Sequence, residues 1–230
     1  MLGDEIVGAD CGAHHDFPVL EGLIVEPGSR DRSCAARIAA ERTGAAIPTS
    51  VIDLIRQGEP AVDTLRGLVE TIGQDESLWY PLSAVILHAP VPEPPQMRDF
   101  SVFPGRIRNA PAGIQRIAAR KQDNEQAAGA VVYRDRPIYY ITNRFSVAGP
   151  GADVLWLDYS RLMDFELELG IFLSRGGRII KASDAALHIF GYTIYNDVSA
   201  RDAQFEEMQS MLGPAKGKSF DAGNVLGPAS

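Results

Sequence analysis

Apolar and polar residues alternate strictly over residues 164–170, where the sequence reads D-F-E-L-E-L-G. Phe165, Leu167 and Leu169 take one side of a predicted strand, and Glu166 and Glu168 take the other. This strand is expected to run over residues 165–173. Runs rich in β-branched, aromatic and aliphatic residues predict further short strands at 82–88, 130–133, 138–142, 154–158, 178–180 and 191–198.

Helical spacing of apolar residues predicts three helices in the first part of the chain, at 33–43, 50–57 and 60–72. Ser50 and Asp53 form a capping-box pattern, and Gly58 follows as a stop signal. Two more helices are expected among the later strands. One is a short helix over 184–190 capped by Ser183, and the other opens with a capping pattern at Ser199 and runs to about residue 212.

Residues 89–95 read A-P-V-P-E-P-P, a composition typical of a stiff linker. It divides a small N-terminal α+β domain at 1–89 from a strand-rich domain at 90–230. A single chain that combines helices with many short strands belongs to the α+β class.

Composition narrows the class of protein. The formal net charge is −8, and there is no basic tract, so nucleic acid and anionic membrane surfaces are poor partners. Apolar runs are shorter than the ~20 residues needed to span a bilayer. The N-terminus lacks the pattern of a signal peptide, and Cys11 and Cys34 suit reduced thiols rather than a disulfide framework. We expect a soluble cytoplasmic protein.

The Glu166 and Glu168 pair is the first candidate for chemistry. Two carboxylates on one strand face, two residues apart, lie only ~7 Å apart and repel each other. If that face turns inward, a cation must neutralise it, and a hard divalent metal with oxygen ligands fits. On the pattern alone, an edge strand whose glutamates face water explains the pair equally well.

Other segments lie in order along the chain: P-x-P at 92–94, M-R-D-F at 97–100, G-Y-T-I-Y-N-D-V-S-A-R-D at 191–202, G-K-S-F at 217–220 and L-G-P at 226–228. Together with E-x-E at 166–168 they resemble the fumarylacetoacetate hydrolase family over residues ~90–230. The resemblance implies a distorted, mostly β, barrel-like catalytic domain. It also implies that the domain normally continues well past the Gly-Pro turn, so we expect it to be incomplete here.

Residue by residue, the resemblance implies that Asp99, Glu166, Glu168 and Asp197 bind the metal. An oxygen-rich site of this kind suits Mg²⁺, Mn²⁺ or Ca²⁺. Neither cysteine and none of the four histidines falls in a ligand position, so zinc is not expected. Asp202 suits a helix-capping role better than that of a fifth ligand.

The resemblance also implies catalytic roles for Arg201, Gln204 and Lys218. Arg201 and Gln204 lie three residues apart in one helical turn and therefore face the same way. Lys218 can reach a carboxylate or a developing enolate as a point charge. Arg106, Tyr140 and Lys218 are the expected substrate-binding residues.

One residue departs from the family. Hydrolases of this family carry a water-activating histidine seven residues after the metal-binding aspartate, and seven residues after Asp99 stands Arg106. Arginine stays protonated and cannot act as that base. A shift in alignment does not help, because no histidine occurs between His88 and His188.

The favoured interpretation is a metal-dependent hydrolase that cleaves a C–C bond in a small 2,4-dioxo acid, as in aromatic catabolism. Two alternatives remain open: decarboxylation or isomerisation of a 2-oxo acid, and a non-catalytic metal-binding relative. The resemblance further implies a homodimer. Strand faces that carry Leu169, Phe172 and Ile194 are expected to be partly uncovered, because their usual neighbours would follow residue 230.

Overall fold

The computed structural model describes residues 50–72, 87–107 and 136–229, together with residues 44, 46–48, 109 and 113. The elements expected at 33–43 and 130–133 lie outside these residues, as does most of 82–88. Helices and mixed sheets both occur in the described part, which agrees with the α+β class. No helix in this part is long and apolar enough to cross a membrane.

Two helices form the N-terminal end of the described chain. Helix α2 spans Val51–Gln57, and the Ser50 hydroxyl caps it by accepting a hydrogen bond from the Asp53 backbone N–H at 3.1 Å. Gly58 ends the helix with a positive φ of 72°. Helix α3, Glu59–Ile72, follows at once, and its buried Leu65 belongs to the apolar face of the pair. These helices match the sequence prediction to within about one residue.

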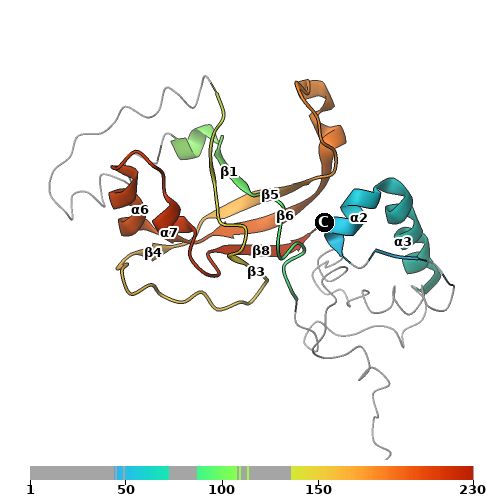
Figure 1. Cartoon of the computed structure of the whole chain (residues 1–230), viewed down its shortest axis with the longest axis horizontal. Coiled ribbons are helices and arrows are strands. Elements are labelled where there is room, and N and C mark those ends of the chain that lie inside the picture. The colour runs from blue at the N-terminus through green and yellow to red at the C-terminus, as the bar shows by residue number, and fades with distance from the viewer. Residues whose placement is uncertain are drawn as a thin grey trace, which may run out of the picture.

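A four-stranded sheet forms the centre of the fold, in the order β3-β8-β6-β5 (Figure 1). Strand β5 runs antiparallel to β6, β6 runs antiparallel to β8, and β3 runs parallel to β8. The order leaves one edge of β5 without a strand partner among the described residues. The strands span Val147–Ala148 (β3), Leu167–Leu173 (β5), Ile189–Asp197 (β6) and Asn224–Ala229 (β8).

Two short ladders flank this sheet. Strand β1, Arg98–Ser101, pairs antiparallel with β2, Ile138–Ile141. Strand β4, Met163–Asp164, pairs antiparallel with β7, Ser199–Ala200. Helices α6, Arg201–Met208, and α7, Ala215–Lys218, pack together at the end of the sheet opposite α2 and α3 (Figure 1).

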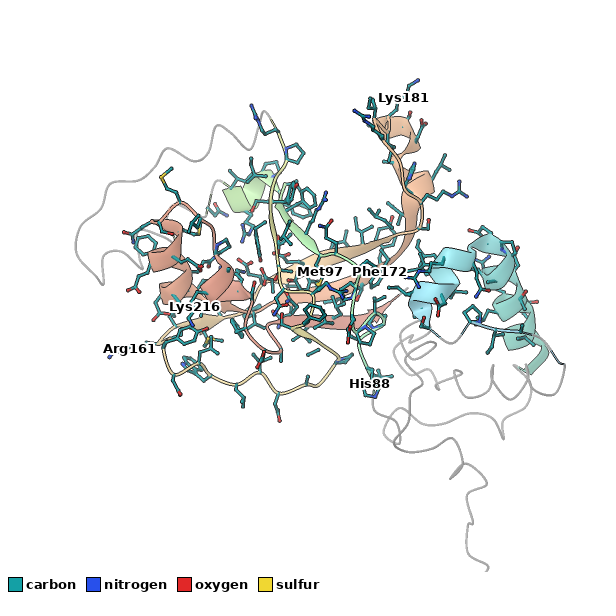
Figure 2. All side chains as sticks on the ribbon, viewed as in Figure 1. His88, Met97, Arg161, Phe172, Lys181 and Lys216 are labelled. Atoms are coloured by element: carbon teal, nitrogen blue, oxygen red, sulfur yellow. The ribbon has the colours of Figure 1, made fainter. Side chains whose placement is uncertain are left out.

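A small core lies against the central sheet. Ala89, Tyr195 and Leu226 are buried together, and Met97 and Phe172 pack against them (Figure 2). The segment 89–95 was expected to be an extended linker, yet Ala89, Pro90 and Val91 are buried. Proline and small aliphatic side chains carry no charge to desolvate, so this stretch can pack against a sheet as readily as it can span a gap.

The alternation of β5 sorts its side chains between two faces. Glu168 shares its face with Tyr195 and Asp197 of β6, which are buried. Leu169 and Ile194 lie opposite each other on the other face and are 59% and 60% exposed. Uncovered apolar faces were expected at both positions, whereas Phe172 is half-buried and packs against the core.

Several predicted elements were wrong in place or type. Residues 154–158 form no strand: Leu155 and Trp156 are exposed, and the Trp156 Nε1–H donates to the Ser160 carbonyl at 2.8 Å in a local turn. Residues 178–180 form no strand either, because Ile179 has a φ of 57°, which interrupts extended backbone.

Three further boundaries differ. The helix expected over 184–190 is a 3₁₀ helix over Ala182–His188, without a side-chain cap from Ser183. Lys181, just before it, lies on the segment that projects from the sheet (Figure 2). The helix expected to run from Ser199 to about residue 212 spans only Arg201–Met208, and its start is later because Ser199 pairs with Asp164 of β4. The expected Gly-Pro turn at 227–228 lies inside β8, at a register shift between the Leu226 and Ala229 pairs with β6.

Candidate metal and substrate site

Strands β5 and β6 bring the first two carboxylates together. Glu168 lies directly opposite Tyr195 in the antiparallel register, and Asp197 ends β6 two residues later on the same face. The backbone N–H of Asp197 donates to the carbonyl of Glu166 at 3.1 Å, which fixes the end of the ladder. Asp197 is fully buried, so its carboxylate must find partners inside the protein.

The β1–β2 ladder supplies the third carboxylate. Asp99 lies opposite Tyr140 in that ladder and is buried. The Tyr140 hydroxyl donates to Asp99 Oδ2 at 3.1 Å and also contacts Asp197 Oδ2, so it links the two aspartates. Burial and the neighbouring carboxylates raise the pKa of Tyr140, which keeps this hydroxyl a donor.

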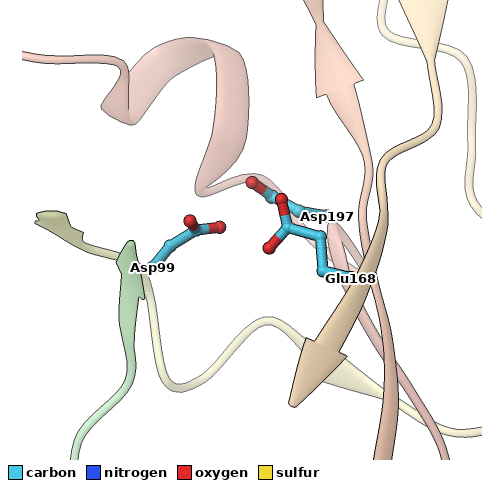
Figure 3. A group of neighbouring side chains, drawn as sticks. All are labelled: Asp99, Glu168 and Asp197. Carbon is cyan, nitrogen blue, oxygen red and sulfur yellow. The ribbon is translucent and has the colours of Figure 1, made fainter. Parts of the chain in front are cut away.

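Asp99, Glu168 and Asp197 converge on one point, and Figure 3 shows their carboxylates turned toward one another. One oxygen from each lies within 4.8 Å of the other two. Oxygens that bind one Mg²⁺ or Ca²⁺ ion at ~2.0–2.6 Å have mutual separations of about this size. Asp197 Oδ1 is buried with no hydrogen-bond partner among the described residues, as expected for a ligand atom.

The electrostatics of these three residues also fit a cation. Burial, together with Asp99, Glu166 and Asp197, raises the pKa of Glu168 to about 8. Burial raises the pKa of Asp197 to about 6, although Lys218 acts in the opposite direction. The site therefore holds more negative charge than its surroundings neutralise, and either a proton or a divalent metal relieves it.

Glu166 has a different environment from Glu168. Its Oε1 accepts from Arg106 Nη2 at 2.5 Å and from Arg201 Nη1 at 2.7 Å, and its Oε2 accepts from Lys218 Nζ at 2.7 Å. Burial acts to raise the pKa of Glu166, but Lys218, Arg201 and Arg106 together hold it at about 2. The fourth carboxylate expected at the metal is thus paired with three cations in this structure.

Helices α6 and α7 position the expected catalytic residues. Arg201, at the first turn of α6, donates to Asp164 Oδ2 at 2.9 Å and to Gln204 Oε1 at 3.2 Å. Lys218, at the end of α7, is 1% exposed and donates to Asp197 Oδ2 at 2.5 Å as well as to Glu166. A buried lysine between two carboxylates is held as a fixed positive charge beside the three-carboxylate group.

Arg106 lies at this site, as its spacing from Asp99 predicts. Its Nη1 donates to Ser101 Oγ at 2.8 Å while Nη2 reaches Glu166. Burial acts to lower the pKa of Arg106, but Glu166, Glu168 and Asp99 raise it, so the guanidinium stays protonated. The residue at the position of the family's water-activating histidine is therefore a permanent cation.

Sequence reasoning missed one residue of the site and placed another correctly outside the carboxylate group. The missed residue is Asp164, which binds Arg201. It stands two residues before Glu166, as Glu166 stands two before Glu168, and this spacing could have identified it from the sequence. Asp202 accepts from Ser160 Oγ at 2.6 Å and takes no part in the three-carboxylate group. Asp202 also accepts from the Arg161 backbone N–H at 2.8 Å, so it ties a loop to α6, whereas the capping role expected for it is wrong: the N-cap is Ala200, without a side-chain cap.

Comparison with known proteins adds a family to this geometry. Oxaloacetate tautomerase YisK of Bacillus subtilis (strain 168) is 31% identical over 189 residues, which are 79% of this chain and 56% of that protein. The mitochondrial oxaloacetate tautomerase FAHD2A of Homo sapiens is 29% identical over 185 residues, 80% of this chain and 51% of that protein. The chain spans about half the length of these curated relatives.

A solved structure, the fumarylacetoacetate hydrolase of Exiguobacterium antarcticum, shares the fold with a TM-score of 0.53 at 21% identity. The match covers 89% of this chain and 59% of that one. The sequence profile described as "Fumarylacetoacetate (FAA) hydrolase C-terminal" matches residues 108–230, which is more than half of the chain. This chain therefore belongs to the fumarylacetoacetate hydrolase family.

Proposed function

We propose that this protein is a divalent-metal-dependent enzyme that interconverts the keto and enol forms of a small 2-oxo acid. The observation that carries the proposal is Arg106, a permanent cation hydrogen-bonded to Glu166 where hydrolases of the family have a water-activating base. Tautomerisation breaks the C3–H bond and protonates the 2-oxo oxygen, with the proton exchanged through solvent, so it needs a stabilised enolate but no water activated as a nucleophile. The names of the relatives YisK and FAHD2A, both oxaloacetate tautomerases, support the same reaction.

Asp99, Glu168 and Asp197 are the residues that would hold Mg²⁺, with Mn²⁺ or Ca²⁺ as alternatives, because all three offer carboxylate oxygens at one point. When bound, the metal supplies Lewis-acid polarisation of the 2-oxo group and orients the substrate carboxylate. Glu166 stays with its three cations in this arrangement and so keeps them in place around the substrate.

Lys218 and Arg201 supply the positive charge for the enolate. Both are fixed before the substrate arrives: Lys218 by Glu166 and Asp197, and Arg201 by Asp164, Glu166 and Gln204. A preorganised charge needs no rearrangement when negative charge develops on the substrate oxygen, and this is where such groups lower a barrier.

C–C hydrolysis of a 2,4-dioxo acid, the reaction that the sequence favours, is the second candidate. Membership of the family supports it, since the solved relative from Exiguobacterium antarcticum is a fumarylacetoacetate hydrolase. It requires a group that takes a proton from water, and Arg106 cannot do this. We therefore rank hydrolysis below tautomerisation, and decarboxylation or a non-catalytic role below both.

One experiment separates these candidates. The Mg²⁺-loaded chain is incubated with oxaloacetate in D₂O, and C3–H exchange and bond cleavage are followed by NMR, with an acylpyruvate in parallel. We expect exchange without cleavage, and at least about a tenfold loss of exchange in Lys218→Met, which removes the fixed charge. Cleavage of the acylpyruvate would favour hydrolysis, loss of the oxaloacetate carboxylate would favour decarboxylation, and no reaction on either compound would favour the non-catalytic role.

Three expectations from the sequence belong to the same proposal. The described sheet is part of a larger barrel-like catalytic domain, the protein acts in the cytoplasm, and it works as a homodimer. The fold shared with the Exiguobacterium antarcticum hydrolase supports the first. The exposed apolar pair Leu169 and Ile194 supports a covered, associated state of β5 and β6.

A further inference from the structure

The three cations that contact Glu166 differ in how much of their binding capacity is used. Lys218 is 1% exposed and sits between two carboxylates. The Arg201 side chain is 19% exposed and is held by two carboxylates and a glutamine. The Arg106 side chain is 43% exposed, the most open of the three.

Arg106 also has donors to spare. A guanidinium carries five N–H groups, and the described contacts of Arg106 are one hydrogen bond to Ser101 and one to Glu166. Glu166 does not depend on Arg106 alone, since Arg201 Nη1 shares Oε1 and Lys218 binds Oε2. Arg106 can thus bind a further anion, or exchange Glu166 for one, while Glu166 stays neutralised.

Arg106 lies beside the three-carboxylate group. Its partner Glu166 accepts from Lys218 Nζ at 2.7 Å, and the same Nζ donates to Asp197 Oδ2 at 2.5 Å, so one lysine separates the Arg106–Glu166 pair from that group. Glu168 and Asp99 also act on the charge of Arg106. A short substrate held at Asp99, Glu168 and Asp197 by its 2-oxo acid end would therefore have Arg106 at the rim of its site. A carboxylate at the far end of that substrate meets a guanidinium fork, the geometry that binds carboxylates in two hydrogen bonds.

We propose that Arg106 anchors the distal carboxylate of the substrate and so selects short 2-oxo dicarboxylates over 2-oxo monocarboxylates. This inference rests on the proposed function for the placement of the 2-oxo acid end. In this proposal Arg106, which stands at the position of the family's base, recognises a second carboxylate of the substrate. An arginine that only ties Glu166 in place would not distinguish the two substrate classes.

Oxaloacetate and pyruvate form a matched pair of probes, because they differ only in the distal carboxylate. Binding of each to the Mg²⁺-loaded 230-residue chain is measured by isothermal titration calorimetry, with freshly dissolved ligand and a protein-free blank. The variants are Arg106→Gln, which removes the charge, and Arg106→Lys, which keeps the charge without the fork. Arg178→Gln is the control, an exposed arginine in the loop after β5 that makes no described contact with the site.

Wild type is expected to bind oxaloacetate at least about tenfold more tightly than pyruvate. Arg106→Gln should reduce that ratio by about tenfold to a hundredfold, the effect of losing a charge-assisted hydrogen bond. Arg106→Lys should fall between the two, and Arg178→Gln should match wild type. An unchanged ratio in Arg106→Gln, or equal losses for both ligands, would overturn the proposal.

Two checks keep the result decisive. If Arg106→Gln lacks a cooperative thermal transition, the wild-type ratio and Arg106→Lys decide: a wild type that binds both ligands equally, or a lysine variant with the wild-type ratio, overturns the anchor. Exchange at C3 is measured on the same samples. An Arg106-dependent preference for oxaloacetate without C3 exchange would contradict the proposed tautomerase function but support the anchor. C3 exchange without that preference would support the tautomerase function but overturn the anchor.

Discussion

Gly217 of α7 and Gln204 of α6 touch through their backbones. A Cβ atom built on Gly217 would lie 2.6 Å from the backbone N and Cα of Gln204, closer than real Cβ contacts allow. The close approach lets α7 lie against α6, which brings Lys218 beside Glu166, to which Arg201 is also bound. The first residue of the G-K-S-F motif is therefore glycine because a larger side chain would collide with the backbone of α6.

Gly217→Ala should displace α7 from α6, because the colliding atoms belong to the backbone and cannot rotate away. We expect a loss of about 1–3 kcal/mol in the free energy of unfolding and at least about a tenfold loss of C3 exchange. Denaturant unfolding and NMR exchange measure the two effects. Gly176→Ala is the matched control, since nothing lies within 4 Å of a Cβ at that position. Equal behaviour of the two variants would contradict the role given to the close approach.

Glu168→Gln should weaken Mg²⁺ and Mn²⁺ binding by at least about tenfold, because it removes one of three converging carboxylates and keeps the side-chain shape. The Lys218 contacts to Glu166 and Asp197 do not involve Glu168, so the fold should persist. Calorimetric titration of the metal measures the change. Glu93→Gln, at an exposed position, is the control and should bind metal as wild type does.

Metal affinity should depend on pH through the same residue. The pKa of Glu168 in the folded protein is about 8, above its ordinary 4.5. Because the folded protein binds this proton more tightly than the unfolded chain does, the proton stabilises the metal-free fold. This stabilisation is complete below about pH 4.5 and is lost as the pH rises through 8. A metal must displace that proton, so affinity should rise by up to tenfold per pH unit toward about pH 8 and then level off.

Calorimetry at pH 6, 7, 8 and 9, in two buffers with different ionisation enthalpies, checks both the affinity and the number of protons released. About one proton per metal is expected near neutral pH. Glu168→Gln should flatten the profile. An affinity that does not change between pH 6 and 8 would show that Glu168 is already ionised without metal.

The exposed apolar face of β5 and β6 should drive self-association. Leu169 and Ile194 are direct cross-strand neighbours, so Leu169→Glu with Ile194→Lys replaces them by an opposite-charge pair that the sheet accommodates. We expect light scattering to show a lower apparent mass for this double variant than for wild type at equal concentration. Leu212→Lys, at a 92% exposed position outside the sheet, is the control. A wild type that stays monomeric at all concentrations would show that this face needs no partner.

Local patterns were sufficient for several parts of the fold. The capping pair Ser50 and Asp53 and the stop at Gly58 predicted α2, because every interaction involved lies within one turn. The alternation at Glu166 and Glu168 predicted a strand with its glutamates on one side. The strand itself begins only at Leu167, whose partner is Asn196 near the end of β6, so Glu166 lies just before the paired segment.

Strand β8 shows where local patterns were insufficient. Its sequence N-V-L-G-P-A has low β-propensity and reads as a turn at Gly227-Pro228. Pairing with β6 at Leu226 and Ala229, on both sides of Gly227-Pro228, keeps the segment in the sheet, and a register shift accommodates the two residues between them. Leu155 and Trp156 are the opposite case, apolar residues that predict a strand and pair with no strand in the described part of the chain.

The sequence by itself determined which side chains are candidates for the chemistry, since carboxylates, arginines and a lysine stand in motifs with fixed spacing. Only the tertiary structure decided which carboxylates converge on one point and which one pairs with the cations. Asp99 joins Glu168 because the β1–β2 ladder, far away in the chain, places it there, while Glu166 meets Arg106, Arg201 and Lys218. Two glutamates of one strand pattern thus differ in pKa by several units, because charge and burial depend on long-range neighbours that a local pattern does not contain.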